Sequence, residues 1–246
     1  MNQNAPATTR SATTRLQRAL RAANPDWAVA EDAIRERADI NARIPELDEK
    51  TLLGHVCGSG RVDSVDWLLD HGADLEIADA NGWTPLIQAV WCQHVEASIR
   101  LLARGADPNA KTAAGHTALM YVAWEPRSDL AEALLKRGAD PNACVPHGRP
   151  VWMQALAWVP THPELVKMFL DHGADPARLI ATSGVAVLEE ADVAANLDAA
   201  LAGPAHAAAR HRLLSRLTLE QRTAWMPRSH AAEATVEAAK TWIRRP

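Results

Sequence analysis

The chain has 246 residues and a formal net charge of −4, with 48% hydrophobic and 23% charged residues. This balance is typical of a globular protein and excludes a disordered or fibrous chain. Only 4% of the residues are aromatic, so the core must be built mainly from Leu, Val, Ile and Ala, which favours closely spaced helices over sheets.

The charge is distributed unevenly along the chain. From Ala205 to the end there are eight Arg or Lys and three Asp or Glu, about +5, which leaves about −9 for the rest of the chain. The basic residues of this tail recur at helical intervals without interleaved aromatics, a pattern that indicates a solvated helix face rather than a nucleic-acid site.

The cysteines and the apolar runs bear on the compartment. Cys57, Cys92 and Cys144 are widely spaced and odd in number, which predicts free thiols in a reducing environment. No apolar run approaches the ~20 residues of a membrane span. The beginning of the chain lacks the apolar stretch of a secretion signal, so the expected location is the cytoplasm.

In chain order, residues 1–15 are rich in Thr, Ala and Asn and are expected to form a disordered leader. Residues 16–38 are expected to form an N-terminal helical cap or a degenerate repeat. The following segment, residues 39–172, is strongly repetitive. Residues 173–246 are expected to hold a degenerate repeat followed by a helical C-terminal cap.

The repeat is marked by several residues that share one period. Gly-Ala-Asp begins at Gly72, Gly105, Gly138 and Gly173, and Arg37-Ala38-Asp39 is a weaker fifth copy. The intervals between these copies are 35, 33, 33 and 35 residues. A second glycine marker keeps the 33-residue period, at Gly82, Gly115 and Gly148. Self-similarity of this kind predicts stacked supersecondary units.

One unit illustrates what the markers do. Thr84 is a good N-cap, and Pro85 then occupies the first helical position, where a missing N–H costs nothing. The sequence predicts a short helix ending near Val90 and a second helix over Val95–Ala103. Gly105 follows that helix, where a positive φ is required and glycine adopts it most easily.

Gly-Trp-Thr-Pro-Leu at Gly82–Leu86, together with Leu101–Asn109, resembles the ankyrin repeat. The resemblance covers about four units and implies an all-α solenoid of stacked helix–turn–helix units with projecting turns. Departures occur: the usual His after Thr-Pro-Leu is replaced by Ile87 and Met120, and Pro150-Val151-Trp152 replaces Thr-Pro-Leu in the fourth unit. By the same alignment Trp67 and Trp152 occupy positions that the family buries.

Motifs for catalysis or metal binding are absent from the sequence. The histidines fall in no HExxH pattern and have no Cys at zinc-ligand spacing, and no GxSxG, P-loop or GxGxxG occurs. We therefore expect no catalytic residues, no metal site and no cofactor.

The tryptophans suggest a binding surface. Trp91 and Trp124 each lie seven residues after the Thr that starts a first helix, and Trp158 lies eight after Pro150. In the ankyrin family this position lies on the concave side, and the turn position of Trp83, His116 and Arg149 also contacts ligands. The sequence predicts a protein partner in the concave groove, bound by Trp83, Trp91, Trp124 and Trp158 with polar contacts from His116, Arg149 and Glu125. The alternative is that these rings pack between adjacent repeats.

Three functional classes remain open. The first is a non-enzymatic binding protein, monomeric when free, such as an adaptor or an inhibitor of the immunity type; the ratio of 21 Arg to 5 Lys is typical of a GC-rich bacterial genome. The second is a secreted effector that binds host proteins. The third, an enzyme, would place its site in the C-terminal part, where His206, His211, Glu220 and His230 form no recognisable arrangement.

Overall fold

The computed structural model describes residues 7–125, 127–144, 148, 150–156, 158, 162–178, 196–197, 199–201 and 206–215. The chain divides into two compact units. Unit 1 comprises residues 1–122 and 136–139, and unit 2 comprises residues 123–135 and 140–246. The expected continuation of the C-terminal cap beyond Ser215, including Glu220 and His230, lies outside the described residues.

The chain is mostly helical, as predicted, and its repeats are built from pairs of short helices. In unit 1 the pairs are α1 (Ala7–Arg21) with α2 (Trp27–Arg35), α3 (Leu52–Gly58) with α4 (Val62–Asp70), and α5 (Pro85–Trp91) with α6 (Val95–Ala103). The boundary between the units passes through α7 (Ala118–Trp124) and α8 (Ser128–Lys136). Unit 2 continues with α9 (Val151–Leu156), α10 (Pro163–Asp171) and α13 (Ala207–Ser215).

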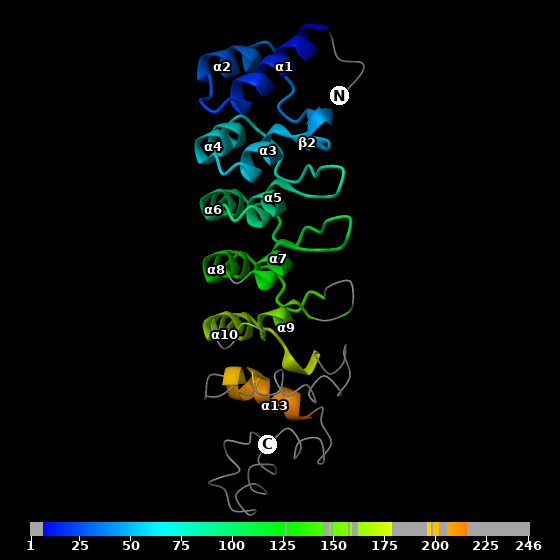
Figure 1. Ribbon diagram of the computed structural model, residues 1–246, viewed down its shortest axis with the longest axis vertical. Helices are drawn as coiled ribbons and strands as arrows, with labels where there is room; N and C mark the ends of the chain where they lie inside the picture. The colour runs from blue at the N-terminus through cyan, green and yellow to red at the C-terminus, as the bar shows by residue number, and fades with distance from the viewer. Residues whose placement is uncertain are drawn as a thin grey trace, which may run out of the picture. The chain divides into compact units, whose positions relative to one another are not determined.

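In unit 1 the helix pairs stack in layers, α3 against α5 and α4 against α6 (Figure 1). The connections between pairs project sideways from the first helices (Figure 1). The first of these connections contains a short antiparallel pair, β1 (Arg43–Ile44) and β2 (Lys50–Thr51), around the 3-10 helix η1 (Pro45–Leu47).

The local signals predicted from the sequence are confirmed in the α5–α6 unit. The Thr84 hydroxyl accepts a hydrogen bond from the Ile87 N–H at 3.4 Å, and Pro85 is the first helical residue. The second helix spans Val95–Ala103, as predicted. Gly105 has a φ of 96°, the left-handed conformation that a residue just past the helix requires.

The beginning of the chain differs from its prediction. Residues 7–15, which were expected to be disordered, form the first part of α1. Ala12 and Leu16 are completely buried, and the Thr13 hydroxyl accepts a hydrogen bond from the Asp39 N–H at 2.8 Å. The Thr/Ala-rich composition concealed this helix, because the buried residues of its first part are the small Ala12 and Thr13, which give a weak apolar pattern.

The core of each layer is aliphatic, with few large aromatic residues. Trp152 is fully buried, as expected. Trp67 is only half-buried, and its indole N–H donates to a Glu31 carboxylate oxygen at 3.2 Å while its ring stacks on His71. The expectation that Trp67 is a core residue was therefore wrong, because an indole whose N–H has a polar partner stays at the surface. This surface is that of the second helices of the pairs, α2, α4 and α6, which we call the second-helix row. No helix in the described part of the chain is long and apolar enough to cross a membrane.

Candidate functional site

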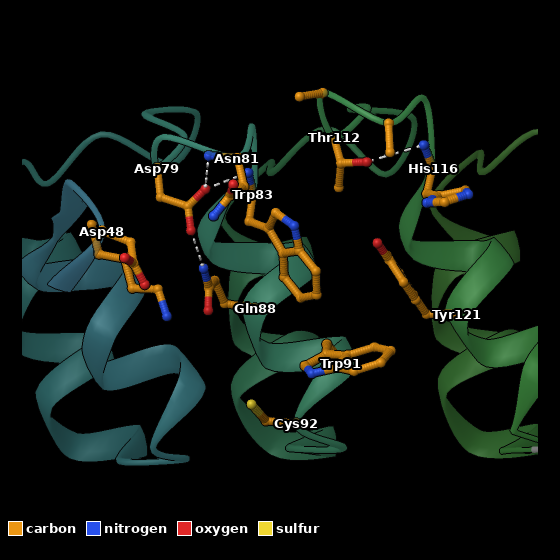
Figure 2. Close-up of a pocket in the computed structure, with 13 residues that line it drawn as sticks. Asp48, Asp79, Asn81, Trp83, Gln88, Trp91, Cys92, Thr112, His116 and Tyr121 are labelled. Atoms are coloured by element: carbon orange, nitrogen blue, oxygen red, sulfur yellow. Dashed lines mark hydrogen bonds between the residues drawn. The ribbon is translucent and has the colours of Figure 1, made fainter. Parts of the chain in front are cut away.

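Unit 1 contains a pocket of about 640 Å³ between its projecting turns and its first helices (Figure 2). The turns contribute residues near Asp48, Asp79 and Thr112, and α5 and α7 contribute the floor. The residues that line it are Asp48, Lys50, Asp79, Asn81, Trp83, Gln88, Trp91, Cys92, Thr112, Ala113, Ala114, His116 and Tyr121.

The turns that form this pocket are hydrogen-bonded to one another. The Ala80 N–H donates to the Asp48 carbonyl at 3.0 Å, and the Ala113 N–H donates to the Asn81 carbonyl at 2.9 Å. Gly82 has a φ of 77°, and a Cβ at this residue would lie 2.5 Å from the Ala113 nitrogen. Glycine is therefore required here both by its conformation and by the close approach of the next turn.

A buried carboxylate holds the Trp83 turn in place. Asp79 is 8% exposed, and its Oδ1 accepts hydrogen bonds from the Asn81 N–H at 2.8 Å and the Trp83 N–H at 2.9 Å. Its Oδ2 accepts a third bond from the Gln88 amide at 2.9 Å. Three donors offset the cost of burying the charge, and they fix the backbone that carries Trp83 relative to α5.

In the next repeat a neutral pair, Thr112 and Tyr121, replaces Asp79 and Gln88. Thr112 occupies the place of Asp79, one 33-residue period later, and Tyr121 occupies the place of Gln88. The Thr112 hydroxyl accepts from the His116 N–H at 3.1 Å. Burial raises the pKa of Tyr121, and a hydrogen bond with the Thr112 side chain acts in the opposite direction. Tyr121 is thus held at the pocket wall by the same turn-to-helix link that holds Gln88.

Trp83, Trp91 and Tyr121 form an aromatic cluster in the pocket (Figure 2). The ring centroids of Trp83 and Trp91 are 5.4 Å apart, those of Trp83 and Tyr121 5.3 Å, and those of Trp91 and Tyr121 5.2 Å. The His116 ring lies 5.8 Å from that of Tyr121. These separations and the edge-to-face angles are those that aromatic pairs favour.

Exposure increases across the cluster from Tyr121 to Trp91. Tyr121 is 8% exposed, Trp83 is half-buried, and Trp91 is 55% exposed. The exposed indole of Trp91 therefore packs against the more buried rings of Trp83 and Tyr121. Such a side chain is already held in place before any partner arrives, so little side-chain entropy is lost on binding.

The other members of the predicted surface belong to unit 2. In unit 2, Trp124 is 37% exposed, and Glu125 is exposed as well. Trp158 is half-buried, and its indole N–H donates to the Ala123 carbonyl at 3.2 Å. Arg149 lies outside the described residues. The structure therefore brings Trp83, Trp91 and His116 together in unit 1, and Trp124, Glu125 and Trp158 belong to unit 2.

Tyr121 and the Asp79–Gln88 pair were not predicted from the sequence as parts of the site. Tyr121 is the only tyrosine of the chain and stands one period after Gln88, a position on the same helix face as the pocket. The 33-residue alignment could have identified it, had first-helix interior positions been compared as closely as the helix ends.

The side chains that could bind a metal or react as nucleophiles include the three cysteines. Within the described ranges, no group of three or more His, Cys, Asp or Glu side chains could hold a metal ion. Cys57 is buried, and burial raises the pKa of its thiol well above the usual range. Cys92 and Cys144 are exposed, and Cys92 lines the pocket.

A family model for ankyrin repeats in three copies matches residues 16–112 and residues 98–179. Together the two matches span residues 16–179, which is two thirds of the chain. The matched range includes the predicted repeats of residues 39–172 and also residues 16–38, which were expected to form a helical cap or a degenerate repeat. No curated protein matches the chain.

Proposed function

The chain belongs to the ankyrin-repeat family, and from that premise we propose that it is a non-enzymatic binding protein whose partner docks on the aromatic pocket of unit 1. Ankyrin repeats generally mediate protein–protein interaction, and proteins built from them are typically binding scaffolds without catalysis. The proposal adds to this the surface that is used and the residues that bind.

The observation that carries the proposal is the exposure of Trp91. A side chain of this size that is 55% exposed is costly to leave in water, and large exposed apolar surfaces mark interaction sites. Tryptophan is also among the residue types that contribute most to binding energy at protein interfaces. Trp91 also contacts Tyr121 of the next repeat, with ring centroids 5.2 Å apart, and its 55% exposure leaves indole surface for a partner.

Around Trp91 the pocket offers both apolar and polar contacts. Trp83 presents a half-buried ring beside it, and His116 and Asn81 line the rim. An interface of this kind has a packed aromatic centre and a polar periphery, which is the arrangement of interface hot spots. The proposal also includes Trp124, Glu125, Trp158 and Arg149, which belong to unit 2.

We place the protein among inhibitors of the immunity type or adaptors. An inhibitor binds a folded partner tightly through a preformed surface, and the Trp83–Trp91–Tyr121 packing supplies such a surface without a conformational change. The predominance of Arg over Lys supports a bacterial origin of the protein, as expected for an inhibitor of the immunity type.

The test is affinity purification of the tagged full chain from its native host, with quantification of the captured proteins. The wild type is compared with the Trp91→Ala/Trp124→Ala double variant and with Trp27→Ala as the matched control. Trp27 is 37% exposed, like Trp124, but it lies on α2, away from the pocket.

The proposal predicts that one partner is lost by about tenfold or more in the double variant, as truncation of hot-spot residues does, and is retained by Trp27→Ala, with both variants folded by circular dichroism. If the protein suppresses the activity of the captured partner, the protein is an inhibitor. If its export depends on a secretion system, it is an effector. Retention of the partner by the folded double variant, or loss of folding without a partner-specific effect, would contradict the proposal.

A further inference from the structure

We propose that the pocket of unit 1 receives an arginine or lysine side chain from a basic segment of the partner protein. This inference rests on the proposed function and specifies the chemistry of the partner. It follows from the indole surface of Trp91 together with the charge of the turns that surround it.

The projecting turns of unit 1 carry an excess of negative charge. Residues 43–51, 72–84 and 105–117 contain seven carboxylates and three cations, so their formal charge is −7 + 3 = −4. The carboxylates are Glu46, Asp48, Glu49, Asp74, Glu76, Asp79 and Asp107. In the described part of the chain, none of these seven forms an ion pair with a cationic side chain.

The charges on the second helices behave differently. There, Arg100 pairs with Asp66 and with Glu96, and Arg104 pairs with Asp70 at 2.7 Å. Thus Asp66, Asp70 and Glu96 on the second helices are compensated by arginines of the chain, whereas the seven carboxylates of the turns are not. An uncompensated field of one sign beside a pocket attracts groups of the opposite charge and disfavours anions.

Within the pocket, Asp48 is the carboxylate that is available for a contact. Its side chain is exposed, whereas Asp79 is buried and already accepts three hydrogen bonds. Lys50 also lines the pocket, but Asp48 and Asp79 together outweigh it. Figure 2 shows Asp48 on one side of Gln88 and the three aromatic rings on the other.

This arrangement fits a long cationic side chain better than a short or neutral one. The methylene stem and the cation can lie on the exposed indole of Trp91, where the ring face attracts positive charge. The cation then lies in the field of Asp48, the exposed carboxylate that lines the same pocket. A guanidinium is favoured because it stacks on aromatic rings and binds a carboxylate through paired N–H groups.

The test uses three short peptides that differ only in charge. A Gly/Ser peptide with several arginines is compared with its citrulline counterpart, which keeps the shape without the charge, and with a glutamate counterpart. Binding to the full-length protein is followed by the indole N–H signals in NMR titrations at low and high salt.

The protein variants are Trp91→Ala, Asp48→Asn and, as the charge-matched control, Asp63→Asn. Asp48 has a φ of 52°, a conformation that Asn tolerates well, so Asp48→Asn removes a charge without disturbing the turn. Asp63 is exposed in the first turn of α4 and does not line the pocket.

We expect the arginine peptide to bind, and Trp91→Ala and Asp48→Asn each to weaken it about three- to tenfold, as loss of a cation–π contact or of a complementary charge does. Asp63→Asn should leave binding nearly unchanged, and high salt should weaken it. Absence of arginine-peptide binding, equal binding of the citrulline peptide, or preference for the glutamate peptide would overturn the inference.

The outcome is separable from that of the proposed function. If the native partner is lost from Trp91→Ala but binds Asp48→Asn and the wild type equally at all salt concentrations, the pocket binds a partner and only the charge inference fails. If Trp91→Ala retains the partner, both fail.

Discussion

The rings of Trp83 and Trp91 meet edge to face at 5.4 Å, although the two residues lie at opposite ends of helix α5. Trp83 precedes the N-cap of the helix and Trp91 is its last residue, so the Trp83 side chain lies along the helix instead of pointing out from the turn. Tyr121, from the following repeat, contacts both rings. A turn position and a helix-end position are thereby joined in one surface.

The first prediction compares an exposed tryptophan with a buried one. Because Trp91 is 55% exposed, Trp91→Ala should lower the free energy of unfolding by no more than about 1 kcal/mol. Trp152 is fully buried, so Trp152→Ala should cost about 3–5 kcal/mol. Urea denaturation of the two variants measures the difference, and equal losses would show that Trp91 serves the core.

The second prediction concerns the titration of Tyr121. Burial raises its pKa above the usual value of about 10. Since it is the only tyrosine of the chain, the phenolate absorbance of the native protein reports on it alone. The absorbance change should occur at a higher pH in the native protein than in the unfolded chain, and coincident curves would contradict the burial of this ring.

The same shift makes folding depend on pH in a defined direction. Because the folded pKa is raised, the contribution of Tyr121 to stability is fully present below about pH 10 and is lost as the pH rises through the folded pKa. The loss occurs because the unfolded state gives up this proton first. Tyr121→Phe should remove this part of the pH dependence, and thermal unfolding of both proteins across the alkaline range measures it.

The third prediction concerns the three thiols. Cys92 and Cys144 are exposed, whereas Cys57 is buried with a raised pKa, so a thiol reagent should modify two cysteines in the native protein and the third only after unfolding. Because Cys92 lines the pocket, a bound partner should protect it. Mass spectrometry identifies the modified residues, and rapid modification of Cys92 in the saturated complex would argue against occupancy of the pocket.

The fourth prediction separates conformational strain from steric clash at two glycines. Gly72 and Gly82 have similar φ values of 85° and 77°, but a Cβ at Gly72 has nothing within 4 Å. Gly72→Ala should therefore cost about 1 kcal/mol from the positive φ alone, and Gly82→Ala should cost about 1–3 kcal/mol more because it pushes the neighbouring turns apart. Equal thermal midpoints for the two variants would show that the turns are not in close contact.

Much of the fold could be predicted from the sequence because its signals are local. The cap at Thr84, the bounds of α6 and the left-handed Gly105 each depend on a few neighbouring residues. The same signals repeat every 33 residues, which identified the stacking. The helical start at Ala7 was missed because α1 buries small and polar residues such as Ala12 and Thr13, which give a weak apolar pattern.

The candidate site could be predicted only in part. Trp83, Trp91 and His116 were identified from their repeat positions, but Tyr121 completes the cluster through contacts that cross from one repeat to the next. The role of Asp79 depends on three hydrogen bonds that form only when the turn folds back toward Gln88. Contacts of this kind depend on tertiary geometry, which sequence periodicity does not specify.

The most direct measurement of the central claim is an NMR titration of the purified partner into the full-length protein, with the nine indole N–H signals assigned by single Trp→Phe substitutions. The account predicts that Trp83 and Trp91 shift or broaden at the lowest partner concentrations, while Trp27 and Trp67 on the second-helix row stay unchanged. Shifts at Trp27 and Trp67 with unchanged signals at Trp83 and Trp91 would contradict the account.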